Sequence, residues 1–140
     1  MRRYLIVANR TLAGDHLVRT VRDLNERREA SFYIVVPATP PQDHTWTDGE
    51  ARAIAQARLD AAIKLLSDVG VDAEGEVGDE RPTYAIQDVL AKREIDEVIV
   101  STLPPGASRW LKRDLPHRIE VEFGLPVTHV IGAPEPTRVV

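Results

Sequence analysis

Short apolar segments separated by stretches of helical periodicity define the architecture that this sequence predicts. Four runs have the length and the β-branched composition of buried strands: Tyr4–Ala8, Ser31–Val36, Glu97–Ser101 and Val127–Ile131. A fifth segment, Asp72–Val77, alternates polar and small residues, which favours an exposed edge strand. The pattern therefore predicts five strands.

Helical periodicity fills each interval between these strands. Thr47 and Glu50 have the spacing of a capping box at the start of the second helix, and Gly70 is expected to end it. Trp46 is expected to pack on the start of that helix. The third helix is expected from about Pro82 to Arg93, and Asp114 is expected to cap the last helix with its carboxylate.

Alternating strands and helices predict the α/β class, with a single-domain five-stranded parallel sheet of order 3-2-1-4-5 and helices on both faces. We assign residues 1–132 to this domain and residues 133–140 to a C-terminal tail. In such sheets ligands bind at the carboxyl ends of the strands, where the strand order reverses. That rule places Asn9-Arg10-Thr11 beside the segment from Ser101 to Asp114.

The segment STLPPGASRWLKRD, from Ser101 to Asp114, is the candidate for chemistry. The net charge of the chain is −4, yet residues 106–119 hold four basic residues and one acidic residue. Three interpretations remain open for this segment. It could be a rigid prolyl connection whose cations form surface ion pairs, a binding site for an anion or a nucleotide-like ligand, or a contact for a protein partner.

Composition excludes several other classes of function. An acidic chain does not favour binding to nucleic acid or to anionic membranes. The absence of cysteine excludes disulfides and thiolate chemistry, and the histidines lack the spacing of metal ligands, so no metal site is expected. The N-terminal apolar run is too short for a signal sequence, which leads us to expect a cytoplasmic protein.

The five-strand pattern, the sequence GEVGD before the third helix, and a fourth-strand loop running into SRWLKRDLPHRI resemble the universal stress protein family over residues 3–132. The resemblance implies an adenine-nucleotide alpha-hydrolase-like fold and a homodimer, commonly formed through the last strand. It also implies ATP or AMP held by a G-x-x-G-x9-G-[ST] motif. On that spacing the motif glycines fall on Val100, Leu103 and Arg113, and the [ST] position falls on Asp114, so all three glycines are replaced.

These replacements change the ligand chemistry that we expect. Leu103 fills space that a glycine leaves open to phosphate, and Pro104 and Pro105 have no N–H to donate. We therefore expect no ATP bound in the usual manner and no resident cofactor, and any anion must be held by side chains. The candidate ligand site combines residues of this segment with residues at the ends of the first two strands, of which Asn9 and Val36 are implied by the resemblance. Its members are Asn9, Thr11, Val36, Ser101, Thr102, Gly106, Ser108, Arg109 and Arg113.

Our first functional hypothesis is a cytoplasmic, stress-response-like binding or regulatory module that forms a homodimer and performs no catalysis. The alternative is an enzyme acting on a phosphorylated small molecule, with Arg109 and Arg113 holding the anion and His16 or His117 moving a proton. A scaffold that binds a protein partner without any ligand is the third hypothesis.

Overall fold

The computed structural model describes residues 1–12, 14–40 and 47–132 of the chain. The expected C-terminal tail, residues 133–140, and the expected packing of Trp46 lie outside the described residues. All five strands that the sequence predicts fall within the described part.

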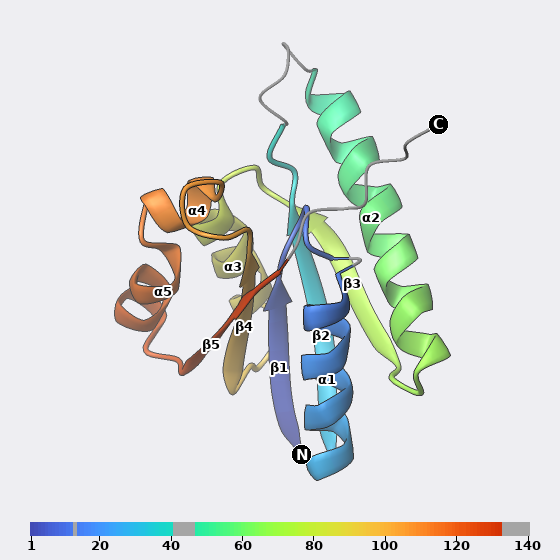
Figure 1. Ribbon diagram of the computed structural model, residues 1–140. Coiled ribbons are helices and arrows are strands. Elements are labelled where there is room, and N and C mark those ends of the chain that lie inside the picture. The colour runs from blue at the N-terminus through green and yellow to red at the C-terminus, as the bar shows by residue number, and fades with distance from the viewer. Residues whose placement is uncertain (13, 41–46, 133–140) are drawn as a thin grey trace.

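The strands form one parallel sheet, with the order β3-β2-β1-β4-β5 (Figure 1). Their bounds are β1 Arg2–Val7, β2 Ala30–Pro37, β3 Ala73–Gly78, β4 Glu97–Thr102 and β5 Val127–Ile131. The order and the parallel direction confirm the predicted fold class. The reversal of strand order between β1 and β4 creates the crevice in which α/β sheets bind ligands.

Helices cover both faces of the sheet (Figure 1). The helices α1 (Asp15–Arg27) and α2 (Asp48–Asp68) pack on one face, and α3 (Pro82–Leu90), α4 (Arg109–Lys112) and α5 (Leu115–Phe123) lie on the other. The short helix α4 was not predicted, and it lies inside the segment that the sequence analysis treated as a loop. The third helix ends three residues earlier than predicted, at Leu90 rather than at Arg93.

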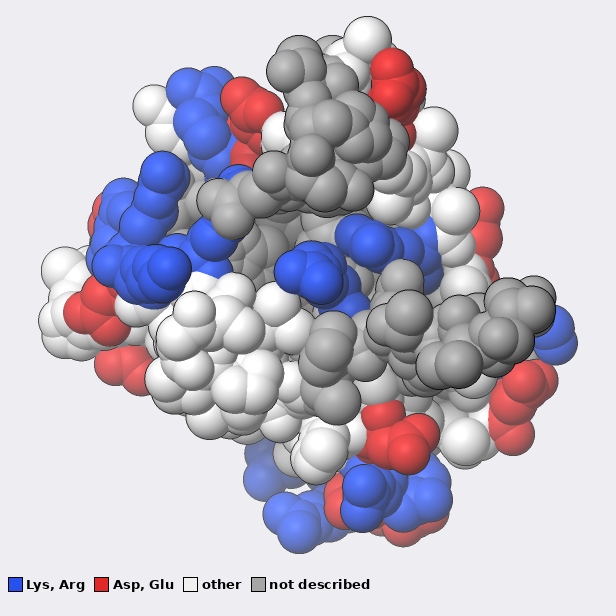
Figure 2. All heavy atoms as spheres, turned by 45° about the horizontal axis from the view of Figure 1, so that its top comes forward, with Lys and Arg blue, Asp and Glu red and all other residues white. Residues whose placement is uncertain are grey.

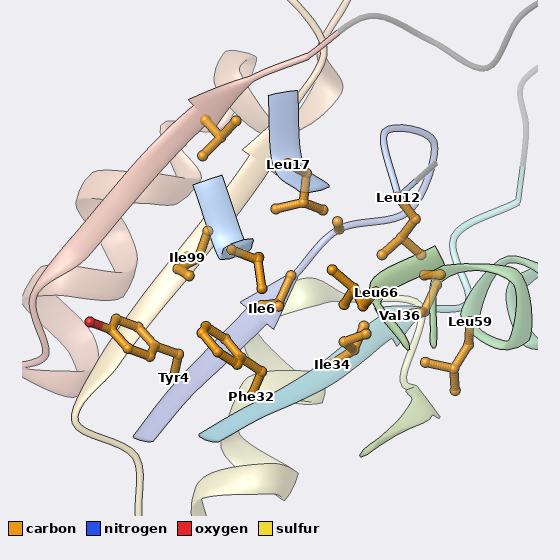
Figure 3. Close-up of a cluster of buried hydrophobic side chains, with 14 of the residues drawn as sticks. Tyr4, Ile6, Leu12, Leu17, Phe32, Ile34, Val36, Leu59, Leu66 and Ile99 are labelled. Carbon is orange, nitrogen blue, oxygen red and sulfur yellow. The ribbon is translucent and has the colours of Figure 1, made fainter. Parts of the chain in front are cut away.

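The core has two layers because side chains alternate across the central strands. Ile6, Ile34 and Ile99 face α1 and α2 (Figure 3), whereas Val7 and Val100 face α3 and α5. The core residues of these strands are buried on both faces, which explains why β1, β2 and β4 are nearly continuous apolar runs in the sequence.

The weak strand β3 is shaped by the close approach of α2. A Cβ atom added to Gly75 would lie 2.5 Å from the Ile34 carbonyl oxygen and 2.6 Å from Leu59 Cδ1. The Ile34 carbonyl belongs to the backbone of β2 and cannot move aside as the end of the Leu59 side chain can, so a glycine is required at this position. This requirement accounts for the small residues that made β3 hard to recognise.

The two predicted N-terminal helix caps have different outcomes. Thr47 Oγ1 accepts a hydrogen bond from the Glu50 N–H at 3.1 Å, which confirms the cap of α2. Its hydroxyl also donates to Glu50 Oε1 at 3.0 Å, so the glutamate contacts the cap hydroxyl. The prediction for Asp114 was wrong: the residue precedes α5, but its carboxylate makes no cap hydrogen bond. Its φ of 55° is left-handed, and not the extended conformation of an N-cap residue.

Candidate functional site

A cavity of about 120 Å³ lies at the carboxyl ends of β1 and β4, where the strand order reverses. The described residues that line it come from the end of β4, from the loops after β1, β2 and β4, from α2 and from the start of α4. They are Asn9, Arg10, Thr11, Thr39, Pro40, Arg58, Ser101, Thr102, Leu103, Ala107, Ser108, Arg109 and Trp110.

Hydroxyl groups form the base of this cavity. Thr11 Oγ1 and Ser101 Oγ are 2.5 Å apart and join the loop after β1 to the end of β4, and both residues are buried. Ser108 Oγ accepts a hydrogen bond from the Leu111 N–H at 3.1 Å, which begins α4 and leaves the hydroxyl proton available to a ligand. In the Thr11–Ser101 pair, one hydroxyl donates to the other, so one further proton remains available.

Thr102 connects the cavity to the edge strand β5. Its Oγ1 lies 2.7 Å from His129 Nε2. Partial burial lowers the pKa of His129, which favours the neutral imidazole near pH 7. The contact therefore joins two neutral groups and adds no charge beside the cavity.

Asn9 links three elements around the cavity. Its Nδ2 donates to the Pro37 carbonyl oxygen at 2.8 Å, and its Oδ1 accepts from Arg58 Nη1 at 2.6 Å. The side chain thus joins the end of β1 to the end of β2 and to α2. Only 7 % of Asn9 is exposed, so these hydrogen bonds lie at the inner wall.

The charge of the described lining has a single sign. Arg10, Arg58 and Arg109 line the cavity, and none of the described lining residues is Asp or Glu. Figure 2 shows Lys and Arg side chains around the hollow on this face. Guanidinium groups together with hydroxyl donors are suited to binding an anion.

The structure brings together six of the nine candidate ligand residues in the lining of this cavity: Asn9, Thr11, Ser101, Thr102, Ser108 and Arg109. The other three lie outside it. The side chain of Val36 is buried in the core between the sheet and α2. Gly106 and Arg113 are exposed, on the loop before α4 and directly after that helix.

Sequence reasoning missed Arg58, which lines the cavity from α2. A signal was present in the sequence. Ala55, Arg58 and Ala62 follow one another at intervals of three and four residues, so the arginine falls within the inner stripe of the helix. A cation in a stripe of buried small residues indicates a polar space opposite it.

The histidines proposed for proton transfer are not in the cavity. His16 on α1 and His117 on α5 are both exposed, and neither is among the described lining residues. Across the described ranges, no three His, Asp or Glu side chains are grouped closely enough to hold a metal ion. Among the described helices, none combines the length and the apolar character that crossing a membrane requires.

A scan of the sequence against models of protein families finds no match, and a search of curated proteins finds no match either. Solved structures do match. A universal stress protein from Archaeoglobus fulgidus has a TM-score of 0.63 at 15 % identity, covering 93 % of this chain and 93 % of that one.

Two further matches are structures with a bound nucleotide. The universal stress protein from Archaeoglobus fulgidus in complex with dAMP has a TM-score of 0.63 at 12 % identity and covers 93 % of this chain and 98 % of that one. A universal stress protein in complex with cAMP has a TM-score of 0.63 at 15 % identity and covers 94 % of this chain and 98 % of that one. The chain therefore has the fold of the universal stress proteins.

Proposed function

We propose that this chain is a binding or regulatory module that takes an anionic, nucleotide-like small molecule in the cavity between β1 and β4. The observation that carries the proposal is the lining, in which three arginines and several hydroxyls converge without a carboxylate among the described residues. The dAMP and cAMP bound by two proteins of the same fold support a ligand that bears a phosphate group.

The mode of binding that we propose differs from a glycine-loop cradle. Leu103 lines the cavity with a side chain, and Pro104 and Pro105 have no N–H. The N–H groups of Ala107 and Ser108 both donate to the Pro104 carbonyl oxygen at 3.1 Å, so the turn uses them internally. Side chains such as Arg10 and Arg109 must then supply the donors, and ATP is not held in the usual manner.

We propose binding without catalysis. The enzyme hypothesis needs a group that moves a proton, and it assigned this step to His16 or His117. Because both side chains are exposed on α1 and α5 and lie outside the described lining, the geometry favours a module that works by binding. We place this activity in the cytoplasm.

The proposed assembly is a homodimer formed through β5. Within the described sheet this strand pairs with β4 alone, which leaves its other edge open to a second copy. Ile131 on β5 is 46 % exposed and Val121 on α5 is 68 % exposed. Light scattering at micromolar protein is expected to give the mass of a dimer, and a monomeric mass would contradict this proposal.

Thermal-shift and calorimetric titrations with ATP, AMP and inorganic phosphate test the proposed function. A ligand at 100 times its Kd stabilises the folded state by about 2.7 kcal/mol. We expect stabilisation by at least one phosphate-bearing probe, reduced in Arg109→Ala and retained in the matched control Arg113→Ala, which lies outside the described lining. Turnover of a probe would favour the enzyme hypothesis. No response to any probe would contradict the proposed binding function and favour the third hypothesis, a scaffold that binds a protein partner.

A further inference from the structure

The polar groups at the inner wall of the cavity are neutral. Asn9 is an amide that accepts from Arg58 Nη1 at 2.6 Å and donates to the Pro37 carbonyl oxygen at 2.8 Å. Thr11 and Ser101 are hydroxyls that bond to each other. The inner wall formed by these three side chains therefore adds no negative charge to a lining that contains three guanidinium groups.

A divalent cation has little to bind in such a lining. Mg²⁺ prefers oxygen ligands and is usually held through one or two carboxylates together with the phosphates of the substrate. The described lining has no carboxylate, and Arg10 and Arg109 in this lining repel a cation. A magnesium complex of a nucleoside triphosphate would also bring less negative charge to these arginines than the free anion does.

A phosphate-sized group fits the space and the donors. A cavity of about 150 Å³ is large enough for benzene, so about 120 Å³ accommodates a phosphate group. Arg10 lines this space from the loop after β1 and Arg109 lines it from the start of α4. Their planar guanidinium groups are suited to binding phosphate. The Ser108 hydroxyl keeps a proton to donate.

We infer that this cavity selects a compact phosphate dianion free of divalent metal, and that the neutral amide of Asn9 decides this selectivity. The inference rests on the proposed function, because it names the class of ligand for the same site. An aspartate at this position would have the same shape. It would place a negative charge at the inner wall, where it would oppose a dianion and attract a metal ion.

The test measures binding of inorganic phosphate and AMP by calorimetry in EDTA and again with excess Mg²⁺. The wild-type chain is expected to bind in EDTA, with no gain in affinity from Mg²⁺. In Asn9→Asp the affinity is expected to fall by about tenfold or more. Asn25→Asp is the matched control, because it makes the same change of charge on α1 outside the described lining, and it is expected to bind as the wild type does.

Two further measurements separate charge from positioning. The ionised carboxylate that Asn9→Asp introduces cannot donate to the Pro37 carbonyl, so Asn9→Ala is included as a variant that removes both hydrogen bonds without adding charge. It is expected to bind phosphate more tightly than Asn9→Asp does. Affinity in Asn9→Asp is also expected to recover at acidic pH relative to the wild type, as the carboxyl becomes neutral and regains a donor.

The outcomes distinguish this inference from the function on which it rests. Phosphate binding that requires Mg²⁺ would overturn the inference and leave the proposed binding function standing. The inference is also overturned if Asn9→Asp binds as tightly as the wild type, or if Asn9→Ala loses as much affinity as Asn9→Asp. If the wild-type chain binds none of the phosphate-bearing probes, the proposed function fails, and the inference fails with it.

Discussion

Arginines gather at both ends of the parallel sheet, but their partners differ. At the amino end, Arg2 Nη2 lies 2.7 Å from Glu97 Oε1, and Arg3 Nε lies 3.0 Å from Asp96 Oδ2. The other oxygen of Glu97 accepts from the Thr128 hydroxyl at 2.6 Å. These contacts tie β1 to β4 and β5, so the amino-end arginines hold neighbouring strands together.

At the carboxyl end, arginines line a cavity instead. The described residues around Arg10 and Arg109 in this lining offer hydroxyls and an amide but no carboxylate. Basic residues alone therefore do not identify a ligand site in this fold. Among the described residues, carboxylates neutralise Arg2 and Arg3 at the amino end, whereas no carboxylate lies with Arg10 and Arg109 in the cavity lining. The difference matters because a neutralised arginine has little attraction left for an anionic ligand.

The largest effect is expected from removing two cations of the cavity. In the double variant Arg10→Ala/Arg109→Ala, the affinity for a phosphate-bearing ligand is expected to fall by about a hundredfold, because both guanidinium forks are lost. Both residues are exposed, so the free energy of unfolding without ligand should change by less than about 0.5 kcal/mol. Calorimetry and urea unfolding measure the two quantities. Unchanged affinity in a folded double variant would contradict the role given to this end of the sheet.

A smaller effect is expected at the amino end, on stability at low pH. Hydrogen bonds from Arg3 hold the pKa of Asp96 down to about 2, below its ordinary value of about 3.8. The folded state therefore gains stability from the ionised carboxylate above about pH 4 and loses it as the pH falls towards 2. Asp96→Asn should be less stable at pH 7 and should lose less stability on acidification.

Urea unfolding of the wild-type chain and of Asp96→Asn at several pH values checks this prediction. Parallel curves of unfolding free energy against pH would contradict it, because they would show that the ionisation of Asp96 contributes no pH-dependent stability. The affinity for phosphate at pH 7 should be the same in both proteins, because Asp96 lies at the opposite end of β4 from the cavity.

The smallest effect is expected from Arg2→Ala. This variant removes the same charge as Arg109→Ala, but from the end of the sheet where Glu97 neutralises it. Its affinity for phosphate should therefore stay within about twofold of the wild-type value, since the loss of a distant charge that Glu97 already neutralises is screened by salt. A large loss of affinity in Arg2→Ala, measured by the same calorimetry, would mean that overall charge and not the cavity governs binding.

The fold could be predicted because buried parallel strands leave a strong signal. Their apolar runs, the helical periodicity between them and the rule for the reversal of strand order together gave both the sheet order and the position of the cavity. Asn9, Thr11 and Ser101 were recognised because they lie at or just beyond the ends of strands, and such residues share one edge of the sheet. Strand β3 was the weakest prediction because the close approach of the β2 backbone and of α2 requires Gly75 there.

Residues that reach the cavity from distant parts of the chain were harder to predict than those at the ends of strands. Arg58 reaches the cavity from a helix 49 residues beyond Asn9, so no local motif connects the two. Arg113 was assigned to the ligand as a cation of the basic segment, but it lies directly after α4, is exposed and is not among the described lining residues. The expectation that Pro104 and Pro105 prevent the usual binding of ATP stays a prediction. The described turn does engage the Pro104 carbonyl oxygen internally.

Nuclear magnetic resonance tests the central claim most directly. The ¹⁵N-labelled chain is titrated with inorganic phosphate in EDTA at constant pH and ionic strength, and the backbone amide shifts are followed residue by residue. The amides of Thr11, Ser101 and Ser108 should shift saturably, while those of Arg3 and Glu97 at the opposite end of the sheet should not. Shifts concentrated at the amino end, or no saturable shift anywhere, would contradict an anion site at the carboxyl ends of β1 and β4.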